Sequence, residues 1–479
     1  MDGCDVRVAV IGAGWAGLSA AVQLTLAGAD VSLFEMSRQP GGRARSLDAR
    51  DDTDKGMVEL DNGQHILIGA YRATLELMQS VGVRPADVLQ RLPLSLPYPD
   101  GSGFTTPSWA TQWPAPWGAI AAIITSRSWR LSDKWSLLAT LRSWRANDFS
   151  CSPQATAAQV CQRVSQQVMQ DLIDPLCVSA LNLTPQQASG QVFLRVMRDA
   201  MLGQGFDAYA ASDLLVPKVG LGCLLPTPAL QWLDGRGTRI EGATQITHLL
   251  ASPGHERTWT LASRLGEHRD WPAFDHVICA TGASAAHKLV SQSLTQDHNR
   301  PARETMGAWA SSVAGLQHTA IGTVYVDVPS SVTTLPAPMI ALPCSGDPAK
   351  TPVQFVFDRT GLGYHSSRPH WAMVASNCMT DTSTLTTAAL DQITQALGLP
   401  VRPTHIKTVI EKRATFACTP ALVRPSPCIA PGLYAAGDYV EGPYPATLEG
   451  AVLSGKSAAL ACLDTHASQC RLEASGTFD

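Results

Sequence analysis

The sequence predicts an α/β fold with a parallel sheet, and its N-terminal stretch carries the prediction. Residues 6–11 (VRVAVI) are a β-branched run typical of a buried parallel strand. A glycine-rich turn follows at 12–17, then a helix-forming stretch that closes at Gly28, and then a second strand at 30–34 that ends at Glu35. Strand, turn, helix, strand and acid in this order predict a dinucleotide-binding βαβ unit, in which Glu35 accepts hydrogen bonds from an adenosine ribose.

Each residue of the glycine turn has a physical task in such a unit. Gly12 permits the tight turn, Gly14 lets a pyrophosphate approach the backbone, and Gly17 lets helix and strand pack closely. Trp15 and Ala16 stand at the start of the helix, whose first amides and partial positive charge favour the phosphates. We therefore expect all five residues to contact the dinucleotide.

Length, charge and cysteine usage narrow the class of protein. At 479 residues the chain exceeds the usual limit of a single core, so two domains are expected. A net charge of −4 without a basic tail gives no reason to expect nucleic acid. The twelve cysteines lack CxxC pairs and metal spacing, which is typical of reduced thiols in a cytoplasmic protein and predicts no metal. Residues 1–5 are too short and acidic for a signal peptide, and no apolar run approaches the roughly 20 residues that span a bilayer.

A second glycine turn indicates which dinucleotide the chain binds. Residues 40–45 read Pro-Gly-Gly-Arg-Ala-Arg and follow Glu35 closely. The combination of GxGxxG, acid and GGR resembles the FAD-dependent amine oxidase and phytoene desaturase superfamily. That resemblance implies FAD as the cofactor, a Rossmann-like FAD-binding domain of the GR2 type, and contact of Gly41, Gly42 and Arg43 with the flavin or its diphosphate. A solvated loop arginine is the other interpretation of Arg43.

Later segments resemble further FAD contacts of the superfamily. A buried strand at 275–282 ends in Ala-Thr-Gly, and another at 431–438 ends in Gly-Asp, where a solvated turn is the alternative. The helix after it would aim its first amides at the flavin pyrimidine, which favours the anionic reduced flavin. An isoleucine at 246 fits the position that clasps the adenine. The resemblance thus adds the cofactor contacts Gly63, Gln64, Ile246, Ala280, Thr281, Gly282, Gly437, Asp438, Ala446, Thr447 and Leu448.

A more specific resemblance begins in residues 57–71. The phrase Asn-Gly-Gln-His at 62–65, then Gly-Ala-Tyr, is similar to the hydroxysqualene dehydroxylases of bacterial hopanoid synthesis, as are Asp-Pro-Leu at 174–176 and the phrase from Asp438 onward. The resemblance implies that hydroxysqualene loses its allylic hydroxyl, gains a hydride from FADH2 and becomes squalene. His65 could donate a hydrogen bond or proton to the leaving group, or it could be a structural histidine bonded to loop carbonyls. A phytoene-desaturase-like or amine-oxidase-like oxidoreductase and a non-catalytic lipid-binding protein on this fold are the alternatives.

The resemblance covers nearly the whole chain and implies interleaved domains. Residues 1–85, 206–285 and 406–479 would form a discontinuous FAD-binding domain, and residues 86–205 and 286–405 an α+β substrate domain. Within the latter, Pro175 is expected to interrupt a helix over 162–173, and a helix over 384–397 is expected to begin at an N-cap Ser383.

The substrate domain contains a tryptophan-rich segment at 109–144. It holds six of the twelve tryptophans, with arginine and lysine residues around an apolar stretch at 120–124. Tryptophan and basic residues suit peripheral contact with lipid headgroups, here the inner face of the cytoplasmic membrane, from which an apolar isoprenoid substrate could enter. The other interpretation is a helical lid whose tryptophans pack on the substrate domain. The sequence leaves the oligomeric state open.

Overall fold

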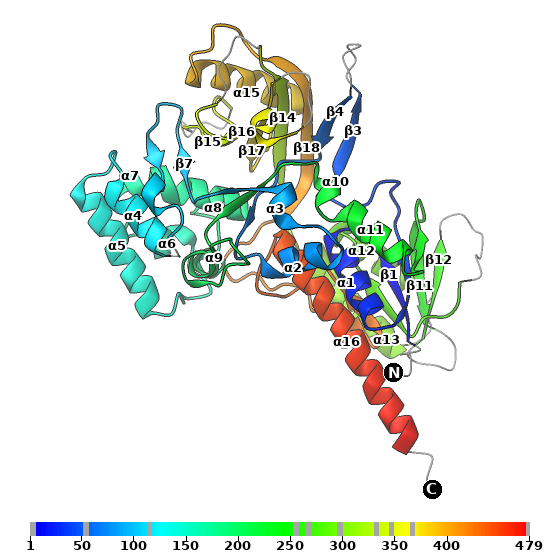
Figure 1. Cartoon of the computed structure of the whole chain (residues 1–479). Coiled ribbons are helices and arrows are strands. Elements are labelled where there is room, and N and C mark those ends of the chain that lie inside the picture. The colour runs from blue at the N-terminus through cyan, green and yellow to red at the C-terminus, as the bar shows by residue number, and fades with distance from the viewer. Residues whose placement is uncertain are drawn as a thin grey trace.

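The computed structural model describes residues 6–50, 57–113, 116–251, 258–263, 271–294, 300–329, 335–343, 349–364 and 369–475. The chain has three parts: an α/β part around a mainly parallel sheet, an antiparallel sheet, and a lobe of helices (Figure 1). The expected N-terminal segment 1–5 and residues 114–115 of the tryptophan-rich segment lie outside the described residues.

The first sheet has six strands in the order β10-β2-β1-β13-β20-β19. The first five run parallel and only β19 is antiparallel to its neighbour. The predicted α/β fold class is therefore confirmed. The central strand is almost entirely buried because helices cover both faces, which explains its β-branched run. The bounds are β1 (Arg7–Ile11), β2 (Asp30–Phe34), β10 (Arg239–Glu241), β13 (His276–Cys279), β19 (Cys428–Ala430) and β20 (Leu433–Ala435).

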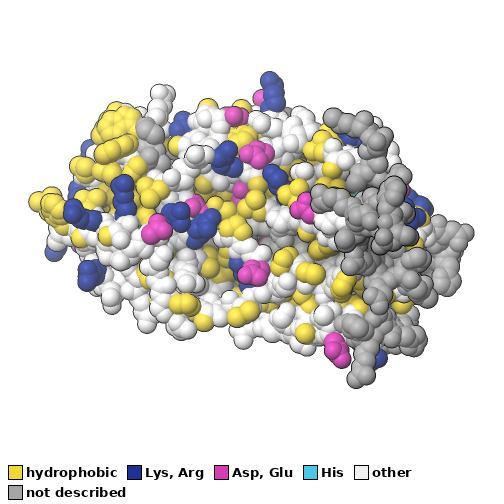
Figure 2. Space-filling view, turned by 90° about the horizontal axis from the view of Figure 1, so that it is seen from below, with side chains coloured by type: hydrophobic (Ala, Val, Ile, Leu, Met, Phe, Trp, Pro, Cys, Tyr) yellow, Lys and Arg dark blue, Asp and Glu magenta, His cyan; other side chains and the backbone are white. Residues whose placement is uncertain are grey.

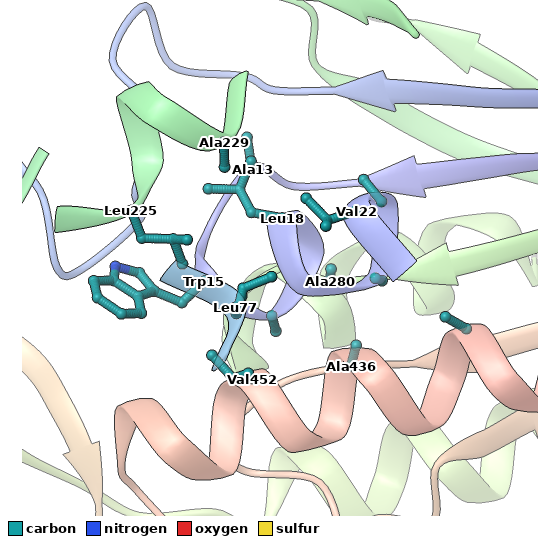
Figure 3. Close-up of a cluster of buried hydrophobic side chains, with 14 of the residues drawn as sticks. Ala13, Trp15, Leu18, Val22, Leu77, Leu225, Ala229, Ala280, Ala436 and Val452 are labelled. Atoms are coloured by element: carbon teal, nitrogen blue, oxygen red, sulfur yellow. The ribbon is translucent and has the colours of Figure 1, made fainter. Parts of the chain in front are cut away.

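Helix α1 (Trp15–Leu26) is enclosed on nearly all sides. Nine of its twelve residues are buried, because the helix lies between the sheet and α16 (Leu448–Ser475). Figure 3 shows α1 beside α16, with Trp15, Leu77 and Val452 where the two helices approach. The Ser19 hydroxyl donates a 2.8 Å hydrogen bond to the Val452 carbonyl, which fixes their register. The beginning and the end of the chain thus share one core.

Further helices and small sheets surround this part. The helices are α2 (Arg72–Ser80), α3 (Pro85–Val88), α10 (Leu221–Leu224), α11 (Pro226–Asp234), α12 (Ala283–Ser293) and α13 (Arg300–Ala314). The small sheets are β3 (Ser46–Arg50) with β4 (Met57–Asp61), β5 (Leu67–Ile68) with β9 (Leu214–Pro217) and β6 (Leu89–Leu92), and β11 (Ile246–Ala251) with β12 (Trp259–Ser263).

The second large sheet is antiparallel, with five strands in the order β15-β16-β17-β14-β18. Helix α15 packs against β14 and β18, and the short helix α14 follows β16 directly. Asp381, not the expected Ser383, is the N-cap of α15, because the Asp381 carboxylate accepts the amides of Ser383 and Thr384. The bounds are β14 (His318–Asp327), β15 (Met339–Ala341), β16 (Phe355–Asp358), β17 (His370–Ser376), β18 (Thr404–Phe416), α14 (Arg359–Leu362) and α15 (Thr382–Ala396).

The helical lobe occupies the end of the molecule farthest from β11 and β12 (Figure 1), and Figure 2 shows apolar and basic side chains together there. Pro175 does not interrupt its helix, because it stands in the first turn of α8, after a π-helical turn at Met169–Ile173, where a proline is tolerated. The other elements are β7 (Leu96–Pro97), β8 (Gly103–Phe104), a 3-10 turn (Ser108–Ala110), α4 (Trp117–Thr125), α5 (Leu131–Ala146), α6 (Ala157–Val160), α7 (Gln166–Val168), α8 (Asp174–Leu181) and α9 (Gly190–Leu202).

The packing of two segments bears on the expected domain boundaries. Helices α12 and α13 share a core with β1 and β13, although the sequence assigns residues from 286 onward to the substrate domain. Strand β18 pairs with β14 in the antiparallel sheet, although residues from 406 are expected in the FAD-binding domain. Among the described residues, no helix combines the length and the apolar character that crossing a bilayer requires.

Candidate functional site

The two glycine turns meet at the carboxyl end of β1. Gly12 has φ +110°, and a Cβ on it would stand 2.6 Å from the carbonyl oxygen of Ala280. A Cβ on Gly17 would lie 1.8 Å from the Gly12 carbonyl oxygen, so α1 and β1 can approach this closely only without a side chain there. The Gly41 amide donates to the Ala13 carbonyl at 2.8 Å, which sets the second turn beside the first.

Glu35 directly follows β2 and lies next to the first glycine turn. Its carboxylate accepts 2.7 Å hydrogen bonds from the amides of Ala13 and Ser37, so it is directed back at the first glycine turn. The Thr244 amide donates to the Glu35 carbonyl at 2.8 Å. Ile246 follows two residues later as a buried residue that begins β11. The structure therefore brings the expected ribose acid and the expected adenine clasp to the same strand end.

Arg43 and Asp438 form an ion pair across 395 positions of the chain. Asp438 is buried rather than part of a solvated turn. A second guanidinium nitrogen of Arg43 donates to the Ala414 carbonyl at 2.6 Å, which ties the GGR turn to β18. Burial by itself lowers the pKa of Arg43, but the negative charges of Asp438 and Glu411 outweigh it and raise that pKa, so the guanidinium stays charged.

The start of α16 lies next to the same pair. The Ala446 amide donates to the Asp438 carbonyl at 3.2 Å, and Ala446 has a left-handed φ of +57° that turns the chain into the helix. The Thr447 hydroxyl accepts from the Gly450 amide and donates to the Tyr444 carbonyl, both at 2.9 Å. The first amides of a helix lack partners within it, so this end supplies donors and partial positive charge beside Gly437 and Asp438.

The region has the space and the unpaired donor that FAD would need. The face of Gly14 is open, since no atom lies nearer than 3.9 Å to a Cβ built there, and a Cβ on Gly282 would meet nothing within 4 Å. The buried Tyr439 hydroxyl has no hydrogen-bond partner among the described residues. Burial raises the pKa of Tyr439, and the charges of Asp438 and Arg43 act on it, so it belongs to the same cluster. The residues present fit FAD.

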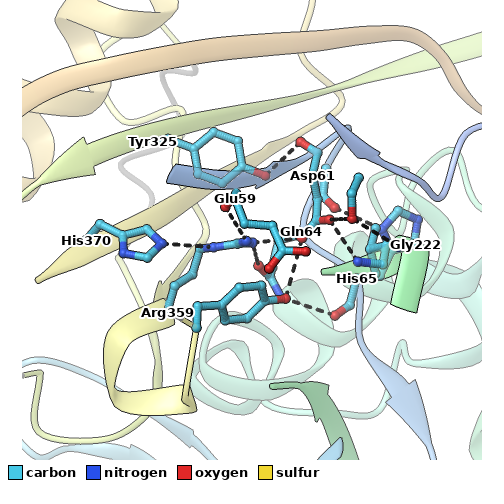
Figure 4. A network of polar contacts seen from close by, with 12 residues as sticks. Glu59, Asp61, Gln64, His65, Gly222, Tyr325, Arg359 and His370 are labelled. Carbon is cyan, nitrogen blue, oxygen red and sulfur yellow. Dashed lines mark hydrogen bonds and ion pairs between the residues drawn. The ribbon is translucent and has the colours of Figure 1, made fainter. Parts of the chain in front are cut away.

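The loop with Gly63, Gln64 and His65 follows β4 directly and is tied to a buried polar network (Figure 4). His65 Nδ1 stands 3.0 Å from the Gly63 carbonyl oxygen, and because a carbonyl only accepts, Nδ1 carries the proton. Burial lowers the pKa of His65, so the ring is neutral at pH 7 and its Nε2 is an acceptor. The Gln64 side-chain oxygen accepts from Arg359 at 3.1 Å.

Arg359 is the centre of this network and is fully buried. Its guanidinium forms a 2.9 Å ion pair with Asp61, donates to the Glu59 carbonyl at 3.0 Å, and stacks 3.5 Å from the ring centre of Tyr364. The Tyr325 hydroxyl donates to the Asp61 carbonyl at 2.9 Å. Strands β4 and β14 and helix α14 are thereby joined beneath the Gln64–His65 loop.

The sequence alone assigns no role in the site to Asp61, Thr323, Arg359 or Tyr439. Thr323 on β14 faces Gly63, and its buried hydroxyl has no partner among the described residues. The sequence carries one signal for Arg359: an arginine directly after the apolar strand Phe-Val-Phe-Asp at 355–358 must find an acid if it is buried. No local pattern identifies Asp61 as that acid.

Glu449 fastens α16 to α2, and its removal is expected to destabilise the protein. Its buried carboxylate accepts the amides of Ala73 and Thr74 at 3.0 and 2.9 Å and the Thr74 hydroxyl at 2.7 Å. Burial raises the pKa of this carboxyl. Glu449→Ala should lower the free energy of unfolding by about 2–3 kcal/mol, because it strands three donors. Urea unfolding measures the change, and Asp464→Ala, at an exposed position on the same helix, is the control; equal stability of the two variants would contradict this contribution.

The chain is similar to known proteins along most of its length. The family model of flavin-containing amine oxidoreductases matches residues 15–463. A hydroxysqualene dehydroxylase of Rhodopseudomonas palustris is 26% identical over 483 residues, covering 94% of this chain and 97% of the relative. One of Zymomonas mobilis is 27% identical over 301 residues, covering 60% and 65%. The crystal structure of an oxidoreductase from Methanosarcina mazei superposes with a TM-score of 0.65 at 16% identity, covering 94% of this chain and 99% of that one.

The family model begins at Trp15, within the first glycine turn, and spans the second glycine turn, the Arg43–Asp438 pair and the first turns of α16, which are among the features that fit FAD. The chain belongs to the flavin-containing amine oxidoreductase family and is an FAD-dependent oxidoreductase.

Proposed function

We propose that the protein removes the allylic hydroxyl of hydroxysqualene reductively and forms squalene. The observation that carries the proposal is the likeness to a hydroxysqualene dehydroxylase across 94% of this chain and 97% of that relative, that is, over nearly the full length of both. The substrate, its reaction and the site roles below are inferred from that likeness and from the geometry.

The residues of this chain have two tasks in such a reaction. Gly12, Gly14, Gly41 and Asp438 would hold FAD, which when bound and reduced supplies a hydride. The Gln64–His65 loop would face the leaving hydroxyl, because the neighbouring Asn62 bonds the Arg43 carbonyl of the GGR turn and Gly63 lies against Thr323 of the antiparallel sheet. An allylic alcohol ionises to a delocalised cation when a donor assists the departing oxygen and water is excluded.

His65 is the proposed donor. The His65→Ala variant is expected to lower kcat on the order of 100-fold, because it removes the only proposed source of the proton that leaves with the hydroxyl. Single-turnover assays with reduced enzyme measure the rate of squalene formation. His405→Ala, a change of an exposed histidine on β18, should retain the wild-type rate. A wild-type rate in His65→Ala would remove this role and leave the neutral, carbonyl-bonded histidine as a structural residue.

The pH profile tests the same role without disturbing the fold. Burial holds the pKa of His65 below its ordinary 6.5, so the protonated, donating form increases only as the pH falls below that value. The wild-type rate should therefore rise on acidification, and the ratio of wild-type to His65→Ala rates should rise with it. A ratio that does not change with pH would mean that the imidazole proton does not reach the substrate.

A direct assay separates the proposal from its alternatives. Anaerobic protein with reduced flavin is incubated with hydroxysqualene, and the products are separated and identified; squalene is expected. Formation of a desaturated product from phytoene by the oxidised enzyme, with no squalene in the first assay, would favour the phytoene-desaturase-like alternative. Oxidation of an amine under the same conditions would favour the amine-oxidase-like one.

A further inference from the structure

Exposed apolar side chains are concentrated in one small region of the helical lobe. Six of the thirteen large apolar residues that are exposed in the described chain fall within 109–135, on the 3-10 turn, α4 and α5 and the loops between them. They include every exposed tryptophan of the described residues. This tryptophan patch consists of Trp109 (58% exposed), Trp113 (45%), Trp117 (58%), Ile124 (60%), Leu131 (76%) and Trp135 (70%).

The two other tryptophans of the segment are packed into the lobe. Trp129 is buried 5.9 Å from Phe104, and Trp144 is buried 5.9 Å from Phe193, as measured between ring centres. The four tryptophans of the patch have no such cover. Trp109 and Trp113 contact each other edge to face with ring centres 5.0 Å apart, so these two indoles are held in place at the surface. A lid packed on the substrate domain would bury them.

Positive charge predominates in the segment that carries the patch. Residues 104–147 contain four arginines and one lysine but a single acid, and the next acids on either side are Asp100 and Asp148, in a chain whose net charge is −4. That acid, Asp133, is buried and accepts the Arg130 amide at 2.8 Å, so it does not face solvent. Lys134 donates to the Ile124 carbonyl at 2.7 Å and joins α5 to the end of α4. The four arginines, Arg127, Arg130, Arg142 and Arg145, are exposed and form no ion pair with a described residue.

We propose that the tryptophan patch docks the protein on a bilayer surface that contains anionic phospholipid. Indole rings favour the headgroup level because one edge is apolar and the N–H is polar, and arginines beside them attract lipid phosphates. Figure 2 shows yellow and dark blue side chains side by side at this end of the molecule. The purpose of docking, entry of an isoprenoid substrate from the bilayer, rests on the proposed function. The docking itself does not depend on that function.

Sedimentation with vesicles tests the docking on the FAD-loaded full chain. Vesicles of phosphatidylcholine alone are compared with vesicles of equimolar phosphatidylcholine and phosphatidylglycerol, and wild type should sediment with the anionic ones. The variant Trp117→Ser/Ile124→Ser/Trp135→Ser should partition at least about ten-fold less. The variant Arg127→Gln/Arg130→Gln should lose roughly five-fold per arginine on anionic vesicles. Unchanged flavin content and melting temperature confirm that both variants fold.

Matched controls change exposed residues away from the patch. Met379→Ser/Val423→Ser removes apolar side chains that are 86% and 83% exposed, and Arg84→Gln/Arg303→Gln removes two exposed arginines. Both should sediment like wild type.

The docking would be overturned if the wild type stayed in solution with anionic vesicles, or if the controls lost binding as much as the patch variants. It would also be overturned if the wild type were a dimer that the triple variant converts to a monomer, because the patch would then bind a second copy of the chain. Because sedimentation needs no substrate, a failed dehydroxylation assay with intact docking rejects only the proposed function.

Discussion

Replacing Gly17 by alanine is expected to abolish tight FAD binding. The new Cβ would stand 1.8 Å from the Gly12 carbonyl oxygen, so α1 must move away from β1 and carry its N-terminus away from the phosphates. We expect at least about 100-fold weaker binding, which corresponds to about 2.8 kcal/mol. Flavin absorbance per protein after purification and titration of the stripped protein with FAD measure the effect.

The control for this prediction is Gly307→Ala on α13. A Cβ on Gly307 would come no closer than 3.9 Å to the Leu294 side chain, which is an ordinary van der Waals contact, so FAD binding should be unchanged although the same methyl group is added. If Gly17→Ala retained wild-type affinity, helix and strand would not be in contact at this position. The assignment of α1 as the helix that faces the phosphates would then be wrong.

Replacing Arg359 by methionine is expected to cost about 3–5 kcal/mol of the free energy of unfolding. The change leaves the Asp61 carboxylate buried without its 2.9 Å partner, and both side chains are at most 1% exposed, so water cannot take the place of the guanidinium. Removing both charges with Arg359→Met/Asp61→Asn should restore part of the loss, because no unpaired charge remains. Urea unfolding monitored by flavin release and by circular dichroism measures all three proteins.

An exposed pair of similar geometry is the control. Arg84 and Asp87 approach to 2.7 Å, but their side chains are 81% and 55% exposed. Arg84→Met should therefore change stability by less than about 1 kcal/mol. If Arg359→Met cost no more than Arg84→Met, the network in Figure 4 would not hold the Gln64–His65 loop in place.

The candidate site is predictable from sequence where local pattern and backbone geometry decide it. The βαβ unit is such a case, because Gly12, Gly17 and Glu35 act within one short segment whose order fixes their relation. Only the resemblance to the superfamily predicts that Arg43 and Asp438 lie in one site. The expectations for Ser383 and Pro175 are wrong, because an aspartate two residues earlier and a π-helical turn changed where each helix begins.

The sequence by itself determined the α/β fold class, the position of the dinucleotide turn and the composition of the tryptophan-rich segment, since each depends on neighbouring residues. The tertiary structure alone decided that Arg359 meets Asp61 across 298 positions, that Trp129 and Trp144 are buried while other tryptophans of the segment are exposed, and that Glu449 reaches α2. These contacts join residues distant in sequence, and burial makes each polar group depend on a partner that no local pattern identifies.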